Sequence, residues 1–494
     1  MNANGLRPYP AYRHSGVEWL GKVPEHWGVR RVATVGDLRV SNVDKHVREG
    51  ESPVRLCNYM DVYHNERIGS DLPFMAGTAT EREIRRFRLA VGDVLVTKDS
   101  EDWSDIGVPA LVEYAADDLV CGYHLAMLRP DGAFLDGGYL FQALRDSHVA
   151  WQFQVAAAGV TRYGLSQNAI RSMRVPLPPL SEQTAIARFL EAADRRIRRY
   201  IRAKERLVEL LEERKRALIH EAVTGRIDVR TSQPYPAHKD SGVEWLGKVP
   251  EHWVRCRLRN VVSEVTTGSR GWSSYAADDG PLFVRVANLS RGSLELRLED
   301  AVRLDLPATS EAARTRIAEG DLLLSVTAYI GSVGVAPEGL GEAYVSQHVA
   351  RCRPSPAVAS KWLGYVLLSS LGQTYGQTRL YGGTKDGLSL DDVRNYPILL
   401  PSRGEQRGLV RWIERRLSLL GELRDATESQ IELLREYRTR LIADVVTGKL
   451  DVREASARLP GADPLAGDRD RTDTIPTESN LHSTAHDTLK EAVP

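Results

Sequence analysis

Apolar and polar residues follow two different patterns along the 494-residue chain, and each pattern occurs twice. In the first pattern, short apolar runs such as residues 94–96 and 322–324 are broken by Gly, Asp, Asn and Pro. Such runs are typical of short strands joined by many loops. In the second pattern, apolar residues recur every three or four positions over a long proline-free stretch, which is typical of an amphipathic helix. The chain therefore predicts an α+β fold in which mixed α/β domains with short strands alternate with long helices.

The two long helices are expected to follow the proline-rich segments 176–183 and 397–406 and to stop near Gly225 and Gly448. Each would span about 40 residues, or about 60 Å, and Ser181 is a suitable N-cap for the first. Their apolar residues alternate mostly in four- and three-residue steps, the spacing of a coiled-coil seam. The residues predicted to pair the helices are Ile186, Leu190, Ile197, Leu207, Leu211 and Leu218 in the first helix, and Ile413, Leu417, Leu420, Ile431, Leu434 and Leu441 in the second. Because a whole domain separates the helices in the chain, we expect them to pair as an antiparallel coiled coil.

Two segments of the first half recur almost unchanged in the second half. YPAYRHSGVEWLGKVPEHW at Tyr9–Trp27 returns as YPAHKDSGVEWLGKVPEHW at Tyr235–Trp253, with 16 of 19 positions identical. AVTGRIDVR at 222–230 returns as VVTGKLDVR at 445–453. A period above 200 residues indicates a duplicated domain pair, because the repeats of solenoid proteins are much shorter. We therefore predict a pseudo-twofold internal repeat.

The repeat and the two patterns together give the domain limits. Two domains, 1–175 and 231–396, are expected to share a fold although most of their sequence has diverged, and we call them the variable domains. A central helical segment, 176–230, separates them, and a second helical segment, 397–453, follows. The tail, 454–494, has few apolar residues and an excess of acidic ones, so we predict that it is disordered.

Composition places the chain among globular proteins with more than one domain. It is 42% hydrophobic and 27% charged, and it is too long for one ordinary core. No apolar window long enough to cross a bilayer and no secretory signal pattern is present, so we expect a cytoplasmic protein. The four cysteines are widely spaced and suggest neither a metal knuckle nor a disulfide framework. The net charge is zero, so nucleic-acid binding would require a locally basic face.

The repeated GVEWLGKV segment resembles a phosphate-binding loop, but the resemblance fails at its last position. Val23 and Val249 stand where such a loop needs a hydroxyl residue to hold magnesium, and no buried strand precedes either copy. We interpret the segment instead as a surface motif in which tryptophans, including Trp27 and Trp253, pack with prolines. The packing would fix the N-terminal segment of each half.

Sequence signatures of catalysis are missing. No GxGxxG, HExxH, GxSxG or paired Cys/His pattern occurs, and we find no carboxylate cluster with the spacing of a metal site. His124 and His348 occupy corresponding positions in the two halves, and we interpret both as structural histidines. We therefore predict no catalytic residue, no metal site and no cofactor in this chain.

The remaining candidate chemistry lies in polar loops of the variable domains. Glycine-flanked arginine, lysine and aromatic residues suit nucleic-acid recognition, because arginine can bridge the two acceptors of guanine, lysine neutralises phosphate and flat rings stack on bases. Each such loop alone also fits an ordinary solvated loop, so the prediction rests on the recurrence of the pattern in both halves. The candidates are Lys98, Arg162 and Tyr163 in the first half, and Arg270, Trp272, Tyr275, Arg379, Tyr381 and Lys385 in the second.

The layout resembles the specificity subunit of type I restriction-modification systems, the HsdS family, over about residues 1–453. The most specific features are the two SGVEWLGKVPEHW segments, the proline-then-Glu-Gln segments at 178–183 and 401–406, and the VTGRIDVR and VTGKLDVR helix ends. GDLLLSVTAYIGSVG at 320–334 also looks like family sequence. Its counterpart at 92–107 departs from that pattern.

The resemblance implies two target recognition domains, each of which reads one part of a split double-stranded DNA target, and two helices that form a spacer. It also implies recruitment of two modification subunits, which bind S-adenosylmethionine and methylate adenine. With restriction subunits they would form a nuclease and translocase that uses ATP and Mg²⁺. No membrane is involved. Because the two variable domains differ in sequence, the bipartite target should be asymmetric, and a rigid helix pair would fix the gap between its halves.

Two other classes of protein remain open on the sequence alone. One is a stand-alone DNA-processing enzyme whose site has no recognisable signature. The other is a coiled-coil adaptor that never touches DNA.

Overall fold

The computed structural model describes residues 6–243, 246–306, 310–380 and 387–460. The chain divides into two compact units. Unit 1 comprises Met1–Arg196 and Tyr437–Pro494, and unit 2 comprises Ile197–Glu436. Each unit therefore contains one variable domain together with part of both helical segments.

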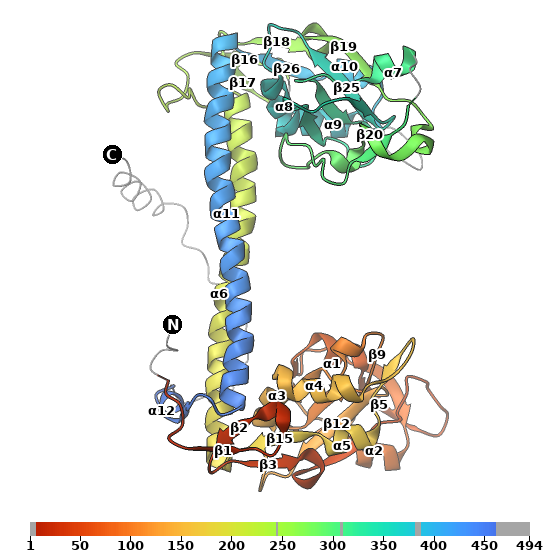
Figure 1. The fold of residues 1–494 in the computed structure, drawn as a ribbon, viewed down its shortest axis with the longest axis vertical. Helices are drawn as coiled ribbons and strands as arrows, with labels where there is room; N and C mark the ends of the chain where they lie inside the picture. The colour runs from red at the N-terminus through yellow and green to blue at the C-terminus, as the bar shows by residue number, and fades with distance from the viewer. Residues whose placement is uncertain (1–5, 244–245, 307–309, 381–386, 461–494) are drawn as a thin grey trace. The chain divides into compact units, whose positions relative to one another are not determined.

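Unit 1 contains a body of short strands and helices, coloured red to orange in Figure 1. Its strands are β1 (Tyr12–His14), β2 (Lys22–Pro24), β3 (Gly28–Arg31), β4 (Gly36–Val40), β5 (Ser52–Cys57), β6 (Arg67–Ile68), β7 (Met75–Ala79), β8 (Val94–Thr97), β9 (Asp99–Ser100), β10 (Pro109–Val112), β11 (Leu119–Cys121), β12 (Leu125–Pro130), β13 (Ala158–Gly159), β14 (Tyr163–Gly164) and β15 (Arg174–Leu177). Its short helices are α1 (Tyr59–His64), α2 (Glu81–Phe87), α3 (Gly137–Arg145), α4 (Ser147–Ala156) and α5 (Gln167–Ser172).

The core of this body lies between two sheets. The larger has five strands in the order β4-β12-β8-β10-β6, and the smaller has three in the order β11-β5-β7. Residues of both sheets share one apolar cluster. Strand β8, at the centre of the larger sheet, is buried along its whole length. This explains why the sequence at 94–96 is a continuous apolar run rather than an alternating one.

Unit 2 contains a second body, coloured green to cyan in Figure 1. Its strands are β16 (His238–Asp240), β17 (Lys248–Pro250), β18 (Val254–Arg257), β19 (Val262–Thr267), β20 (Ala276–Val284), β21 (Val302–Leu304), β22 (Leu322–Ser325), β23 (Val333–Val335), β24 (Ala343–Val345), β25 (Val349–Pro354) and β26 (Pro397–Leu400). Its short helices are α7 (Ser310–Thr315), α8 (Ser360–Leu368), α9 (Ser370–Thr378) and α10 (Leu390–Arg394). The main sheet is antiparallel with the order β19-β25-β22-β23, and β21-β20-β24 form a second sheet.

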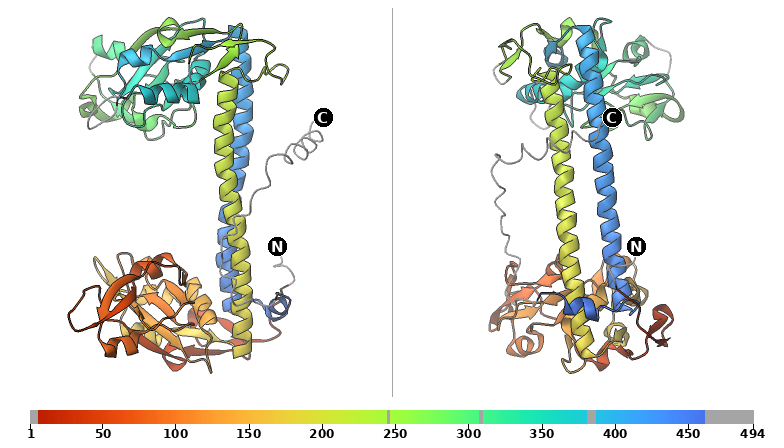
Figure 2. Two further views of the ribbon diagram at one scale, coloured as in Figure 1. Left: turned by 180° about the vertical axis from the view of Figure 1, so that it is seen from behind. Right: turned by 90° about the vertical axis from the view of Figure 1, so that its left-hand side faces the viewer.

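Two long helices, α6 (Leu180–Val223) and α11 (Arg403–Val446), account for the two helical segments. Each has 44 residues, or about 66 Å at the α-helical rise, and they lie side by side in Figures 1 and 2. Helix α6 begins at Leu180 rather than after Ser181, because the Pro179 carbonyl already accepts the Gln183 N–H at 3.0 Å. The predicted N-cap is therefore wrong by two residues.

Polar contacts fix the relative direction of the two helices in unit 2. In unit 2, Arg424 binds Glu212 at 3.4 Å, Lys204 donates to Gln430 at 2.5 Å, and Arg435 binds Glu205 at 3.1 Å. In unit 1, Arg438 pairs with Asp194. The partners in α11 lie later in the chain where those in α6 lie earlier, so the helices are antiparallel, as a coiled coil of this kind requires.

Most residues predicted to pair the helices are buried, but one of them is not. The fully buried ones are Ile186, Leu190, Ile197, Leu211, Leu218, Ile413, Ile431 and Leu441, and the half-buried ones are Leu417, Leu420 and Leu434. Leu207 is 37% exposed, because Lys204 and half-buried Val208 occupy the inward-facing positions of this part of the helix instead. Its assignment to the seam is wrong.

The segment after α11 begins with structure rather than disorder. Residues Arg453–Ala457 form a short helix, α12, and Ser456 in it is buried. The remainder of the predicted tail, from residue 461, lies outside the described residues. No helix in the described ranges is long and apolar enough to cross a membrane.

Candidate nucleic-acid interface

The segment that is repeated in the sequence holds the ends of the long helices. In unit 1, Glu182 in the first turn of α6 is buried and accepts three hydrogen bonds: from Trp27 Nε1 at 3.0 Å, from His26 at 2.9 Å and from the Tyr9 hydroxyl. Burial and the bond to Glu182 raise the pKa of Tyr9, so its hydroxyl remains a donor. Three residues of the repeated segment, Tyr9, His26 and Trp27, therefore share one partner on the helix.

The same segment also contacts the end of the other helix. Gly448 follows α11 with φ of 77°, and a Cβ at this position would overlap Pro24. We call this arrangement the helix-end clamp. In unit 2, Glu405 accepts from Trp253 at 3.1 Å and Tyr235 at 2.6 Å, while Gly225 packs against Pro250.

The surface position predicted for Trp27 and Trp253 is therefore wrong. Trp27 and Trp253 are among the largest fully buried side chains, because each packs beneath a helix end and donates to a glutamate at a helix start, Glu182 or Glu405.

Replacing Gly448 by alanine should lower the free energy of unfolding by about 1–3 kcal/mol, because a left-handed φ and overlap with Pro24 both oppose a Cβ. Gly421, in the middle of α11 with open space around its Cα, is the matched control. Gly421→Ala should instead stabilise the chain by about 0.5–1 kcal/mol. Thermal unfolding of both variants measures the difference, and equal effects would contradict the clamp.

The structure brings together the three residues proposed for DNA contact in the first half. The loop 156–165 folds into the hairpin β13–β14, and β14 pairs with β9 directly after Lys98. Arg162 at the tip of the hairpin is exposed, and Tyr163 is half-buried. The three side chains therefore belong to one small sheet at the end of β8.

Lys98 is not free at this site. Its Nζ donates to Asp99 Oδ2 at 2.7 Å, and His124 Nδ1 lies 2.5 Å from the same oxygen. Burial would raise the pKa of Asp99, but the bonds from Lys98 and His124 outweigh it and hold the pKa below its ordinary value. The exposed ring of Tyr123 packs against His124 at a tilt of 54°, with centroids 3.8 Å apart. These residues form a charged and aromatic surface, which we call the unit 1 edge cluster.

The candidates of the second half are not all in one place. Arg270 and Tyr275 are exposed, and Arg379 lies exposed at the end of α9 with its guanidinium 5.4 Å from the Tyr375 ring. Tyr381 and Lys385 lie outside the described residues. The end of their loop returns beside β22, where Leu388 N–H donates to the Val326 carbonyl at 2.8 Å.

Trp272 is not a DNA contact. It is 6% exposed and packs edge-on against Tyr344, with centroids 5.6 Å apart, in an apolar cluster that also contains Phe283. The short 3₁₀ helix Trp272–Tyr275 that follows Gly271 turns the indole inward. The sequence pattern of an aromatic residue among glycines and serines could not distinguish this core position from a surface one.

Two exposed tyrosines, Tyr123 and Tyr329, also lie at these edges and were not among the residues predicted from the sequence. Tyr123 precedes His124, and Tyr329 lies in the turn after β22, whose Thr327 hydroxyl is 2.5 Å from His348 Nδ1. The corresponding positions of the two histidines were a signal that could have led to both tyrosines. Both histidines are hydrogen-bonded, in keeping with a structural role.

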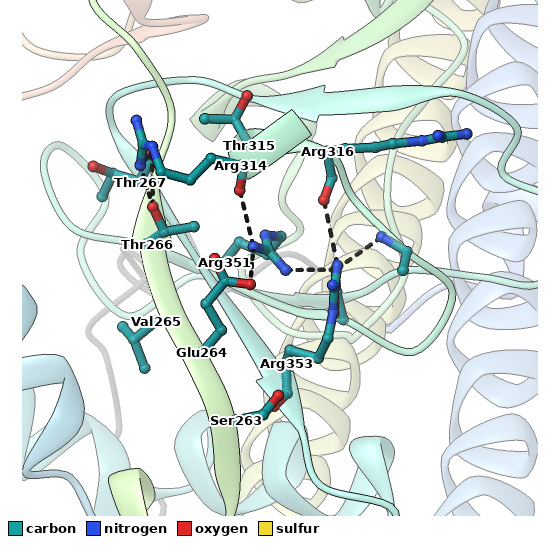
Figure 3. Close-up of polar contacts among 12 residues, drawn as sticks. Ser263, Glu264, Val265, Thr266, Thr267, Arg314, Thr315, Arg316, Arg351 and Arg353 are labelled. Carbon is teal, nitrogen blue, oxygen red and sulfur yellow. Dashed lines mark hydrogen bonds and ion pairs between the residues drawn. The ribbon is translucent and has the colours of Figure 1, made fainter. Parts of the chain in front are cut away.

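A buried charge network supports the main sheet of unit 2 (Figure 3). Arg351 on β25 and Asp321, just before β22, are each 1% exposed and lie 3.3 Å apart. Arg351 also binds Glu264 of β19 at 2.7 Å, and Arg353 binds Asp321 at 2.8 Å. The network ties three strands together, and Arg351 is therefore not available to DNA.

No group of three or more His, Cys, Asp and Glu side chains among the described residues is placed to hold a metal ion.

Comparison with known proteins gives one consistent family. A protein-family model described as the type I restriction modification DNA specificity domain matches residues 77–207. The chain is 22% identical over 439 residues to the putative type I restriction enzyme MjaX specificity subunit of Methanocaldococcus jannaschii, covering 88% of this chain and 96% of that protein. It is 21% identical over 468 residues to the EcoKI specificity subunit of Escherichia coli K12, covering 91% and 94%.

Two solved structures have the same fold. One, described as the structural basis underlying complex assembly and conformational transition of the type I R-M system, has a TM-score of 0.64 at 19% identity and covers 87% of this chain and 99% of that chain. The other, the HsdS subunit from Thermoanaerobacter tengcongensis, has a TM-score of 0.54 at 20% identity and covers 87% and 98%. With its two units and its antiparallel helix pair, the chain is similar in sequence and fold to the specificity subunits of type I restriction-modification systems, the HsdS family.

Proposed function

We propose that this chain is the DNA-specificity subunit of a type I restriction-modification complex. Each variable domain would read one part of an asymmetric bipartite target, and the helix pair would hold the two readers and dock the modification subunits. The observation that carries the proposal is the likeness to specificity subunits over nearly the whole chain. Under it, 1–175 and 231–396 are the recognition domains, while 176–230 and 397–453 are the spacer segments.

A pseudo-twofold repeat is part of this proposal. It is supported by the helix-end clamp, which uses the same residue types in both units: Tyr, His and Trp donate to a glutamate at a helix start, and a glycine follows the other helix. A duplicated frame with diverged loops is what two readers of different sequences would require.

The surfaces at the ends of β8 and β22 support an asymmetric target. In unit 1 this edge holds Lys98, Asp99 and His124 in one charged cluster. In unit 2 the corresponding edge holds a hydrogen bond between Thr327 and His348. Different donors and acceptors select different base edges, so the two half-sites would differ.

An exposed apolar face of the helix pair supports docking of the modification subunits. In unit 2, five leucines are 37–65% exposed: Leu207 and Leu210 on α6, and Leu419, Leu423 and Leu433 on α11. Each of these leucines comes one residue before a position that faces the other helix. In an antiparallel pair, residues one position before the seam point to the same side of the pair on both helices. The leucines therefore form one stripe suited to a partner helix. S-adenosylmethionine, ATP and Mg²⁺ would then belong to the partner subunits.

Replacing Leu419 and Leu423 together by aspartate should weaken binding of the modification subunit at least ~10-fold, because the complex would bury two unpaired charges. Folding should be unaffected, because both side chains are exposed in the free chain. Glu436→Ala, which changes an exposed residue of α11 that is not one of the five leucines, is the control. Calorimetric titration measures both, and unchanged binding by the double variant would place the docking surface elsewhere.

Mapping methylated adenines in cells with and without this chain tests the whole proposal. With the modification subunits present, a split motif should be methylated only when the chain is present. The purified chain alone, with DNA, Mg²⁺ and S-adenosylmethionine, should neither cleave nor methylate. Turnover by the chain alone would support a stand-alone enzyme, and an assembled complex without salt-dependent DNA binding would support an adaptor.

A further inference from the structure

The turn between β22 and β23 in unit 2 has a strained backbone. Ala328 and Tyr329 have φ values of 46° and 45°, in the left-handed region that residues other than glycine rarely occupy. Such a conformation persists only where surrounding groups hold it, and it is found preferentially at binding sites. The strain alone does not identify a ligand, and the side chains that the turn exposes have to be considered with it.

Buried polar side chains hold this turn in place. The Tyr329 carbonyl accepts from the Ser325 hydroxyl at 2.6 Å, and from the hydroxyl and N–H of Ser332 at 2.9 and 3.2 Å. The Gln373 amide donates to the Gly331 carbonyl at 2.9 Å. Ser325 and Ser332 are buried, so these bonds do not compete with water. The position of Tyr329 is therefore fixed by the frame of the unit.

The turn presents an arginine stacked on a tyrosine. Tyr329 is 62% exposed, and the Cζ atom of exposed Arg291 lies 3.7 Å from its ring centroid. Arg291 makes no hydrogen bond or ion pair with any residue that the structure describes, whereas nearby Arg297 donates to the Ala287 carbonyl. Stacking uses the face of the guanidinium and leaves its planar set of N–H donors free at the edge.

We propose that Arg291, held flat by Tyr329, is a specificity-determining residue of unit 2 and that it reads a guanine in the half-site of that unit. A guanidinium edge donates two parallel bonds to guanine O6 and N7, the commonest specific arginine contact in the major groove. The cation–π contact restricts the side chain before binding, so less conformational freedom is lost when the base is bound. This proposal rests on the proposed function and adds to it the residue and the base.

The experiment uses the complete complex with its modification subunits on a library of duplex DNA with randomised half-sites, read by sequencing of methylated adenines. The wild-type complex should require guanine at one position of one half-site. Arg291→Ala should reduce that preference about 10- to 100-fold and leave the other positions unchanged. Arg291→Lys should keep the charge and lose most of the preference, because lysine lacks the bidentate edge. Tyr329→Phe should retain it, and Tyr329→Ala should weaken it.

Arg259→Ala, which removes another exposed arginine of the same unit, is the matched control and should leave the motif unchanged. A uniform loss over all sequences with a shallower salt dependence in Arg291→Ala would mean a phosphate contact and would overturn the proposal. An unchanged motif would overturn it as well. In both cases the wild-type complex would still methylate a split motif, whereas failure of the proposed function would appear as sequence-independent methylation by the wild type.

Discussion

Asp321→Ala is expected to cost the body of unit 2 about 3–5 kcal/mol of folding free energy. Asp321 and Arg351 are each 1% exposed, and removal of the carboxylate leaves a buried guanidinium with fewer partners. Glu264 cannot replace it fully, and the Arg351 Nε atom already lacks a hydrogen-bond partner among the described residues. The Ala318 N–H, which donates to Asp321 at 2.8 Å, would also be left unsatisfied. Chemical denaturation followed by tryptophan fluorescence measures the loss.

Two further variants show whether the loss of folding free energy comes from the buried guanidinium left without its carboxylate. In unit 1, Asp93 binds Arg129 at 2.6 Å, but Arg129 is 30% exposed and can turn to water. Asp93→Ala should therefore cost less, about 1–3 kcal/mol. Arg351→Met should be milder than Asp321→Ala, because Asp321 keeps Arg353, and Met127 already occupies the equivalent register opposite Leu95 in unit 1. Equal losses for all three would contradict the charge argument.

Elements defined by long or repeated patterns could be predicted from the sequence. The seam spacing predicted two helices of about 40 residues, and the structure has two of 44. The apolar runs at 94–96 and 322–324 are the central strands β8 and β22. Both kinds of pattern reflect burial, which acts on many residues at once. Leu207 was misassigned because Val208 beside it is also apolar, and the apolar pattern alone does not reveal which of the two faces the other helix.

The contact residues were harder to predict, because they depend on backbone geometry. Lys98 was found, but its pairing with Asp99 and His124 depends on the small sheet that the hairpin β13–β14 completes. Trp272 was misassigned because its direction is set by a single turn. Arg291 and Tyr329 are far apart in sequence and meet only through a strained turn. The DNA contacts that were proposed from the sequence remain predictions.

The repeated segment shows why a motif can be recognised correctly and interpreted wrongly. Trp27, His26 and Tyr9 were visible as a motif, yet their common partner, Glu182, lies more than 150 residues away in the chain. The Glu-Gln pair in the first turn of each helix belongs to the same attachment: in α6, Gln183 donates to the Pro178 and Phe134 carbonyls. Both features of the resemblance therefore describe one structural unit, the attachment of a domain to the helix pair.

Lengthening both long helices together should widen the tolerated gap between the half-sites without changing either half-site. Seven residues inserted into α6 and seven into α11, at positions facing each other, preserve the heptad seam and add about 10 Å. At about 3.4 Å per base pair this corresponds to about three additional base pairs. Methylation of a library with variable gaps measures the shift, and a changed half-site sequence would contradict the separation of reading from spacing.

Insertion into α6 alone is the informative control. It would move Lys204 and Glu205 away from Gln430 and Arg435, while Glu212 stayed beside Arg424. The contacts on one side of the insertion would then be lost, or the inserted residues would bulge out of the helix. Such a variant should lose methylation or keep the original gap, because the unchanged α11 would still set the distance. If one helix alone produced the full shift, the antiparallel pair would not be the spacer, and the gap would have to be set by the bodies or by the partner subunits.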